Sequence, residues 1–475
     1  MKRMKITGRK KLLFVFMQAV MLTGYGQADS LLVLSEPEFI NIVRKYHPVA
    51  KQANLFVEMA RAQLTAARAG FDPLFYMSTE RKTFDGKNYY NFTQPELKIP
   101  TWYGINLKAG LERNIGDLLN SEVTPGRSSY AGIEVPLAKN LVMDKRRAVL
   151  KQAKIFREQS KAGRLNIIND LLFDAYAAYW NWVKEYRIYQ LVTDVVRVNE
   201  QRLKLVRLSY QQGDKPAIDT TETLAQLQAF QLAQNEAMVK FKTAGFELSN
   251  YMWLENDSAW SMPDTVVPDP SWNNVNTSSV NIPALDQVLT LARTNHPKLQ
   301  VFDFKLQMLE IEKQLKFQNL LPLFNVKYNV LNSGYNVFKD IDRQLLDNNY
   351  KFGIDIGIPL RLSQGRGEYR AAKIKIQETG LDLFQTRLVI DNKVKQYFNE
   401  LVALQAQVSI AEDNYNNYLR LFRGEELRFR AGESSLFLLN TRENKLLEAF
   451  QKLVDLKTKF FKTYAGLQWA AGQLR

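Results

Sequence analysis

The segment IDNKVKQYFNELVALQAQVSIAEDNYNNYLRLF, residues 390–422, carries apolar side chains in a sustained 3–4 alternation. The positions that keep this spacing are Ile390, Val394, Tyr397, Leu401, Leu404, Val408, Ala411, Tyr415, Tyr418 and Phe422. A second run repeats it at Leu446, Phe450, Leu453, Phe460, Tyr464 and Leu467, with Lys457 interrupting the apolar seam once. Heptads sustained over several repeats are typical of helices that pack as coiled coils. Long paired helices are therefore expected to dominate the fold.

The distribution of proline indicates how long these helices are. No proline interrupts residues 137–215 or 360–475. We predict one long helix over about 143–211 and another over about 366–430, each ~100 Å long at 1.5 Å per residue. Each is expected to turn back into a shorter helix of about 35 residues, so that two antiparallel hairpins result. The two turns are marked by Gly213 and Gly432.

The chain repeats one order of motifs in its two halves, which indicates an internal duplication. The dipeptides His47-Pro48 and His296-Pro297 lie 249 residues apart, and Pro73 and Pro322 keep the same offset. Two further pairs follow in the same order: GIEVPL (132–137) with GIDIGIPL (353–360), and YQQGDKPAID (210–219) with FRAGESSLFL (429–438). We therefore expect two structural repeats.

The two repeats differ in length. Pro73 and Val135 are 62 residues apart, whereas Pro322 and Ile358 are 36 residues apart, so the first repeat carries 26 extra residues. The sequence leaves open whether these form another strand, an external lid or a belt around the helices. We divide the chain into a leader (1–28), a first repeat (29–262), a polar linker (263–283) and a second repeat (284–475).

The two histidines of the chain both precede proline. Proline favours the first turn of a helix, because its fixed φ suits the helix and its missing N–H would have no partner there. A metal site would need further His, Cys or carboxylate ligands at suitable spacing, and none accompanies His47 or His296. We interpret the pair as a duplicated helix start, and predict no catalytic, metal-binding or cofactor-binding residue in the chain.

Four segments alternate apolar residues with polar residues or glycine, as half-buried or membrane strands do. They lie in YGINLKAGLE, AGIEVPL, FNVKYNV and YKFGIDIGI, over residues 103–112, 131–137, 324–330 and 350–358. Known membrane barrels have at least about eight strands, and lipid does not tolerate open sheet edges. If these strands enter a membrane, several chains must share one barrel. The segment GKNYYNF (86–92) and the segment 119–129 are expected to be turns or loops.

The first 28 residues predict export from the cytoplasm. Six basic residues precede the apolar run LLFVFMQAVML (12–22), and Gly26 and Ala28 offer small residues for a signal-peptide cleavage site. Removing this segment reduces the net charge from +15 to +9, a mild excess that does not favour nucleic-acid binding. The chain has no cysteine, which excludes disulfides and a cysteine nucleophile.

The leader, the duplication, the strand pairs ending in VPL and IPL and the glycine turns together resemble the TolC family of outer-membrane efflux channels. The fold class that this implies is α+β, with long helical coiled-coil hairpins reaching into the periplasm. The resemblance also implies a homotrimer in outer-membrane lipid, with four strands per chain in a twelve-stranded barrel and twelve helices in a tunnel. The expected partners are a periplasmic adaptor and an inner-membrane pump.

The resemblance further places functional residues at the glycine turns. Adaptor contacts are expected at Gln212, Gly213, Asp214, Ala431, Gly432 and Glu433. Candidate gate residues are Asp219, Phe429, Leu438 and Thr441. Leu438 and Thr441 stand where the family's best-known member has aspartates, so an apolar ring would replace an acidic one.

Two other functions compete with a channel. A periplasmic adaptor or structural coiled-coil protein without a pore would share the helices, but would be expected to carry compact β-domains around one hairpin. An enzyme using paired carboxylates would need acidic residues that converge on a site, and the 49 acidic residues are spread along the helices. The exported substrate and the partner pump are not readable from the sequence.

Overall fold

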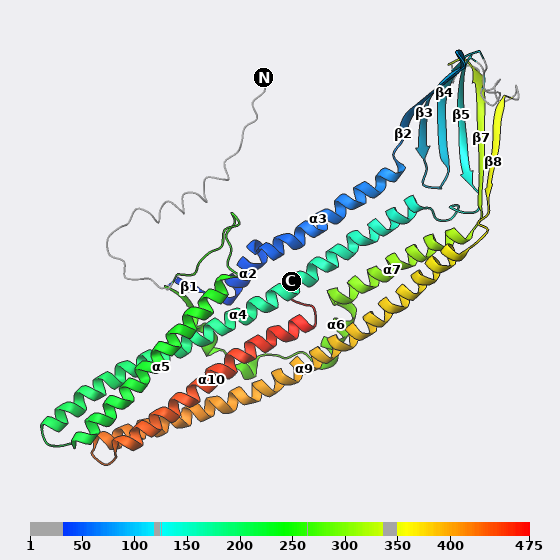
Figure 1. Cartoon of the computed structure of the whole chain (residues 1–475). Helices are drawn as coiled ribbons and strands as arrows, with labels where there is room; N and C mark the ends of the chain where they lie inside the picture. The colour runs from blue at the N-terminus through cyan, green and yellow to red at the C-terminus, as the bar shows by residue number, and fades with distance from the viewer. Residues whose placement is uncertain (1–31, 118–123, 125, 264, 336–348) are drawn as a thin grey trace, which may run out of the picture. The chain divides into compact units, whose positions relative to one another are not determined.

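The computed structural model describes residues 32–117, 124, 126–263, 265–335 and 349–475, and Figure 1 shows the elements. The predicted signal peptide and most of the predicted 119–129 loop lie outside the described residues. The chain divides into two compact units. The tip unit comprises the described residues within Met1–His47, Asp174–Val280 and Ala403–Lys462. The sheet unit comprises those within Pro48–Phe173, Asn281–Val402 and Thr463–Arg475.

Long helices begin in the sheet unit and end in the tip unit. They are α4 (Lys145–Gln211) and α9 (Ser363–Arg430), followed by α5 (Ala217–Ser249) and α10 (Leu436–Ala470). These bounds confirm the helices predicted over 143–211 and 366–430 and the shorter helices after each glycine. The heptad positions Leu401, Leu404 and Val408 are at most 2% exposed. Burial of such positions stabilises each helix by about 1.5–3 kcal/mol per large apolar side chain.

The tip unit also contains the first helix and the residues predicted as a linker. Strand β1 (Leu32–Leu34) pairs in parallel with β6 (Val266–Pro268), and α2 (Glu36–Tyr46) follows β1. Short 3-10 helices, Pro270–Asn274 and Thr277–Ser279, come after β6 and bury Trp272 and Thr277. The Tyr179 hydroxyl donates a hydrogen bond to the Leu34 carbonyl oxygen at 3.1 Å, which attaches β1 to α4.

The sheet unit contains a six-stranded antiparallel sheet in the order β2-β3-β4-β5-β7-β8 (Figure 1). Its strands are β2 (Leu74–Phe84), β3 (Lys87–Pro100), β4 (Asn106–Ile115), β5 (Gly126–Pro136), β7 (Leu323–Ser333) and β8 (Tyr350–Gly357). Helix α3 (Pro48–Arg68) precedes β2, and α6 (Leu285–Asn295) and α7 (Pro297–Phe317) precede β7. A 3-10 helix, Ala69–Phe71 or Gln318–Leu320, links α3 or α7 to its strand.

The expectation of four strands per chain was wrong, because the described residues form six in this sheet. Four of them lie between α3 and α4, and two between α7 and α9. The 26 extra residues of the first repeat therefore correspond to an additional strand pair, β3 and β4, because the equivalent prolines Pro73 and Pro322 directly precede β2 and β7. The segment 86–92, expected to be a turn or loop, starts β3 instead. The turn is confined to Asp85 and Gly86, whose positive φ values of 51° and 74° are those of a two-residue hairpin.

The pleat gives the sheet two chemically different faces, since successive side chains point to opposite sides. The pairing register places one apolar set together: Phe75, Met77, Leu97, Leu107, Ile133, Tyr328, Phe352, Ile354 and Ile356. Each of these side chains is between 37% and 67% exposed. The opposite face carries Glu96, Lys98, Lys108, Glu134, Lys327 and Asp355. This sheet therefore exposes a broad apolar surface on one side and charges on the other.

Both His-Pro dipeptides begin helices, as predicted. Helix α3 starts at Pro48 and α7 at Pro297. The Nδ1 atom of His296 accepts a hydrogen bond from the Lys298 backbone N–H at 3.1 Å, which caps α7. Both imidazoles are buried, with at most 9% of each residue exposed.

In the described part of the chain, no helix contains an apolar stretch of 18 residues suited to crossing a membrane.

Candidate functional site

The two glycine turns have the same backbone hydrogen bonds. The Gly213 N–H donates to the Tyr210 carbonyl and the Asp214 N–H to the Ser209 carbonyl, at 3.0 and 2.9 Å. At the other turn the Gly432 N–H donates to Phe429 and the Glu433 N–H to Arg428, at 3.1 and 2.9 Å. This pattern, with glycine φ values of 79° and 78°, is the Schellman cap of a helix C-terminus. We call the segments 212–214 and 431–433 the tips.

A lysine next to the first tip links two of the candidate gate residues. The Lys215 Nζ atom lies 3.9 Å from the Asp219 carboxylate and 4.0 Å from the centre of the Phe429 ring. Phe429 belongs to the last turn of α9 and Asp219 to the first turn of α5. The structure thus brings Asp219 and Phe429 together through a cation, and sequence reasoning missed Lys215. An opposite charge i,i−4 from Asp219 was the signal that could have identified it.

The other two gate candidates lie on α10 and bond to their own helix or to the residue just before it. The Thr441 hydroxyl donates to the Phe437 carbonyl at 2.7 Å, and the Leu438 backbone N–H donates to the Ser435 hydroxyl at 3.3 Å. Leu438 is 41% exposed, and Phe437 next to it is 67% exposed. Ile218, beside Asp219 on α5, is also 67% exposed. The start of each returning helix therefore presents apolar side chains to its surroundings.

A buried ion pair ties α4 to α10 about three turns from the tips. The Arg202 guanidinium donates two hydrogen bonds to the Glu443 carboxylate, at 2.6 and 3.0 Å, and both side chains are at most 10% exposed. Asn199 lies beside the pair and accepts a hydrogen bond from Arg202 at 2.9 Å. The Asn440 amide donates to Glu222 at 3.1 Å, which adds α5 to the same network.

The network joins the hairpin of α4 and α5 to α10 of the other hairpin. A bidentate arginine–carboxylate pair has a fixed geometry, and separating it inside a packed interface exposes an unpaired buried charge. It is therefore suited to holding two hairpins in one arrangement until an outside interaction compensates its loss. No local pattern in the sequence indicates this ion pair, because the two residues are 241 positions apart.

Charges on the polar face of the sheet are paired across strands. The Lys108 Nζ atom lies 2.7 Å from the Glu134 carboxylate, and Lys98 approaches the same carboxylate at 3.6 Å. Lys327 and Asp355 pair at 2.6 Å between β7 and β8. Pairs on one face of neighbouring strands stabilise the sheet by about 0.2–1 kcal/mol each. This face is suited to an aqueous environment.

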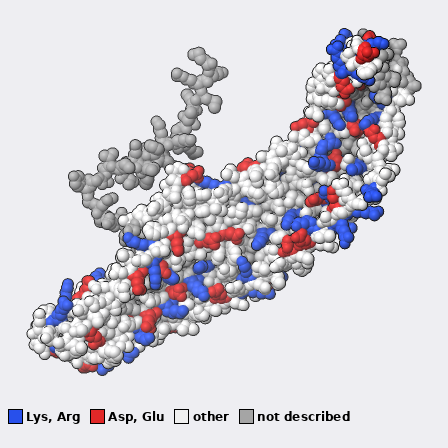
Figure 2. Space-filling model, in the orientation of Figure 1, with Lys and Arg blue, Asp and Glu red and all other residues white. Residues whose placement is uncertain are grey.

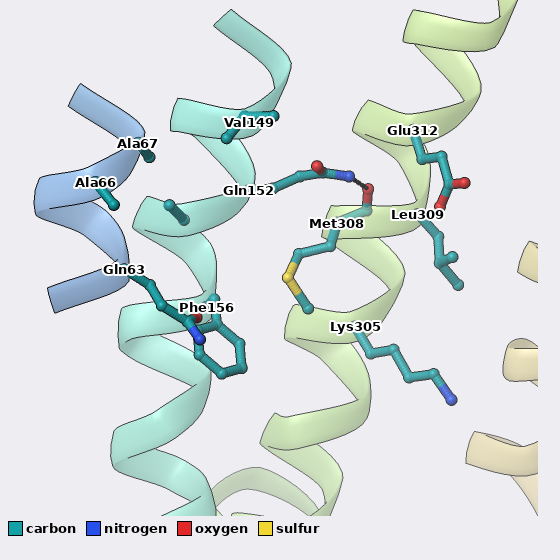
Figure 3. Close-up of a pocket in the computed structure, with 11 residues that line it drawn as sticks. Gln63, Ala66, Ala67, Val149, Gln152, Phe156, Lys305, Met308, Leu309 and Glu312 are labelled. Atoms are coloured by element: carbon teal, nitrogen blue, oxygen red, sulfur yellow. Dashed lines mark hydrogen bonds between the residues drawn. The ribbon is translucent and has the colours of Figure 1, made fainter. Parts of the chain in front are cut away.

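A cavity of about 630 Å³ lies in the sheet unit between α3, α4 and α7 (Figure 3). Its lining is mainly apolar and includes Phe156 and Met308. The Gln152 side-chain amide reaches from α4 and donates to the Met308 carbonyl of α7 at 3.2 Å. This bond joins the two helices, and the cavity is best explained as a gap in their packing.

Basic and acidic side chains are interspersed along the helices on the face shown in Figure 2. Such mixing is typical of a solvated helical surface.

Comparison with known proteins gives a family match for the second half of the chain and a fold match for most of it. Residues 288–473 match the model of the family described as outer membrane efflux protein. A search of curated proteins gave no match.

Solved structures similar to the chain include outer-membrane channels of three bacteria. They are CmeC of Campylobacter jejuni, VceC of Vibrio cholerae and the open state of MtrE of Neisseria gonorrhoeae, with sequence identities of 14%, 14% and 15%. Each has a TM-score of 0.63 and matches 92% of this chain, covering 85%, 95% and 89% of the respective channel. These structural matches, at 14–15% sequence identity, show that the fold is shared. Together with the family match they confirm the resemblance to the TolC family. Residues 288–473 thus form an outer membrane efflux protein domain, and the chain has the fold of the TolC-family channels.

Proposed function

We propose that the chain is the outer-membrane channel component of a tripartite efflux or type I secretion system. The observation that carries this proposal is the sheet, with one exposed apolar face and one face of paired charges. Membrane strands need this division, since one side contacts lipid and the other lines water. Long helices continue from the same sheet and extend the conduit into the periplasm.

In this function the chain works as a passive conduit and needs no cofactor. Copies of the chain share one barrel, because the sheet of one chain leaves open edges that lipid does not tolerate. The resemblance to the TolC family supports three copies, a homotrimer. The tips, Gln212 to Asp214 and Ala431 to Glu433, contact a periplasmic adaptor, and an inner-membrane pump supplies the energy. The identical caps of the two tips support this, because they give the adaptor two similar backbone turns per chain.

The gate lies next to the tips, at Asp219, Phe429, Leu438 and Thr441. The proximity of Lys215 to Asp219 supports a constriction in which the acidic charge is partly compensated. The exposed Leu438 supports an apolar contribution from α10. Adaptor binding at the tips separates the hairpins and opens the gate.

Single-channel conductance of the detergent-extracted protein in a planar bilayer, with the oligomer mass measured in parallel, tests this function. We expect a trimer with small or flickering currents, which increase in Asp219→Ala or Leu438→Ala. Glu236→Ala, an exposed position on the same helix as Asp219, is the matched control and should leave the current unchanged. A protein of any mass that never inserts into the bilayer would instead favour a periplasmic coiled-coil adaptor.

A further inference from the structure

We propose that the additional strand pair widens the membrane barrel, so that each copy contributes six strands and β8 of one copy pairs with β2 of the next. A three-chain barrel then has eighteen strands rather than the twelve implied by four strands per chain. This inference rests on the proposed channel function. It concerns the interface between copies and the size class of solutes that the membrane pore admits.

Side-chain hydrogen bonds on the polar face connect β3 to β5 across β4. The Tyr130 hydroxyl on β5 donates to the Glu96 carboxylate on β3 at 2.5 Å and accepts a hydrogen bond from the Gln94 amide at 2.8 Å. The ring passes over Gly110 of β4, where an added Cβ would come within 2.6 Å of the ring. Tyr130 is only 3% exposed. The additional strands are therefore integrated into the sheet rather than attached loosely to its edge.

The turn between β3 and β4 is likewise fixed to the base of the sheet. The Trp102 ring stacks on Phe71, with ring centres 4.2 Å apart and planes 15° apart. Phe71 ends the 3-10 helix just before β2. The Arg146 guanidinium donates to the Asn106 side chain at 3.0 Å, which attaches the first residue of β4 to α4. Both ends of the additional pair thus contact the elements that carry the chain into and out of the sheet.

The apolar face continues without a change of side onto the additional strands. Phe75 on β2 is the register partner of Leu97 on β3, and Leu97 is the partner of Ala109 on β4. Phe75 is 67% exposed and Leu97 is 37% exposed. Placing any of these three strands outside the lipid would leave this surface in water, at a cost of about 25 cal/mol per Å² of apolar area. The face is therefore best satisfied when all six strands contact lipid.

The two outer strands are compatible partners for each other. The described strands of the sheet alternate in direction, so β2 and β8 run antiparallel, and β8 of one copy can continue the alternation into β2 of the next. An unpaired backbone group in lipid costs several kcal/mol, and these two strands supply the free edges of the sheet. The second copy of this chain is therefore the occupant that we assign to each edge.

Strand number determines the width of a barrel. Diameter grows about linearly with the number of strands, and barrels of about 16–18 strands enclose a wide aqueous channel. A pore of eighteen strands has about one and a half times the circumference of one with twelve. The narrowest point for a solute is then at the helix tips, and the membrane pore admits bulky solutes.

Disulfide cross-linking between copies tests the pairing, because the chain has no cysteine of its own. One set of variants combines a cysteine at Phe75, Met77 or Thr79 on β2 with one at Phe352, Ile354 or Ile356 on β8. The matched set combines the same β8 positions with Leu107, Ala109 or Leu111 on β4, which would adjoin β8 if β2 and β3 lay outside the barrel. Val326→Cys with Ile354→Cys, register partners within one chain, is the oxidation control.

We expect the β2–β8 set to form disulfide-linked dimers and trimers in membranes and the β4–β8 set to form none. Linkage of the β4–β8 set, or of neither set while the control pair oxidises, would overturn the inference. Each variant is also tested for conductance in planar bilayers. A protein that conducts but links through β4 contradicts the eighteen-stranded barrel alone, whereas one that never inserts contradicts the channel function itself.

Discussion

Lys457 shows how a residue that breaks a sequence pattern can be satisfied by tertiary structure. It interrupts the apolar seam of α10 and is buried. Its ammonium group contacts the Glu412 carboxylate of α9 at 2.5 Å and donates to the Asn273 carbonyl at 3.0 Å. These partners are distant in sequence, so the pattern showed the interruption but could not explain it. A buried charge of this kind requires both partners.

Replacing Lys457 tests this pairing. Lys457→Ala should lower the free energy of unfolding by about 1–3 kcal/mol, less than a fully buried pair because Glu412 is 35% exposed and can be rehydrated. Lys457→Met keeps most of the packing volume and should cost less than alanine. Guanidinium denaturation followed by circular dichroism measures both. Equal stability of wild type and the alanine variant would show that the ion pair contributes nothing.

His296 makes the stability of the fold dependent on pH. Burial of its imidazole lowers its pKa from 6.5 to about 4. Between these values the unfolded chain binds a proton that the folded chain does not, so stability falls as the pH is lowered from 6.5 to 4. The loss at pH 4 is about 3 kcal/mol. Burial also lowers the pKa of His47, which adds to the effect in the same direction.

His296→Asn should reduce this pH dependence, because asparagine can cap α7 but does not titrate. Denaturation midpoints at pH 7 and pH 4 should lie closer together in this variant than in the wild type. His296→Ala is the control that also removes the cap, and it should lose about 1 kcal/mol at pH 7. An unchanged difference between the two pH values in His296→Asn would contradict a neutral, buried imidazole.

At the scale of elements, the tips depend on backbone conformation rather than on packing. An added Cβ at Gly432 would meet no atom within 4 Å, yet the residue has a φ of 78°. Gly432→Ala should therefore cost about 1–2 kcal/mol through the left-handed conformation alone. Gly424→Ala, eight residues before Gly432 within α9 and also with open space, should stabilise the helix by about 0.5–1 kcal/mol.

Limited proteolysis at the tip, with a denaturation curve for each variant, separates these two effects. Cleavage near residue 432 should accelerate in Gly432→Ala and slow or stay constant in Gly424→Ala. Destabilisation by both substitutions would indicate a steric restriction that the isolated chain does not contain, such as close contact between copies.

The Arg202–Glu443 pair connects one hairpin to the other, so its removal should affect both stability and gating. Arg202→Met leaves the Glu443 carboxylate buried without its partner, which costs about 3–5 kcal/mol in comparable interiors. We expect larger and longer single-channel currents in Arg202→Met because the hairpins separate more easily. The double variant Arg202→Met with Glu443→Leu should recover stability. Wild-type currents from Arg202→Met would exclude the pair from gating.

At the scale of the whole molecule, helices and strands with a regular apolar pattern could be predicted from the sequence. Strands whose pattern is interrupted could not. Heptads and the absence of proline predicted the helices α4, α5, α9 and α10, and alternation predicted β4, β5, β7 and β8. Alternation did not predict strand β2, because residues 78–83 are polar on both faces of the strand. Strand β3 was not predicted either, because Pro95 and Pro100 argue against a strand. Pro95 lies where the pairing register of β3 and β4 is interrupted, so its missing N–H is tolerated there.

In the candidate site, features with a local sequence signal could be predicted, whereas contacts between residues distant in sequence could not. The tips were predictable because glycine at a helix end is a local signal that occurs in both repeats. The ion pair of Arg202 and Glu443 was not, because its residues look like solvated helix charges until the fold brings them together. Lys215 was close enough in sequence to Asp219 to be identified, but its contact with Phe429 depends on the neighbouring hairpin.

Membrane topology gives a test of the whole molecule that uses its lack of cysteine. Lys87→Cys lies at the turn between β2 and β3, and Gln212→Cys lies at the first tip, with both positions exposed. A thiol reagent that cannot cross membranes should label Lys87→Cys in intact cells, because the strand turns opposite the helices face the exterior. Gln212→Cys should react only after the outer membrane is permeabilised. Mass spectrometry of the purified variants measures the labelled fraction, and labelling of both sites in intact cells would contradict a periplasmic location of the tips.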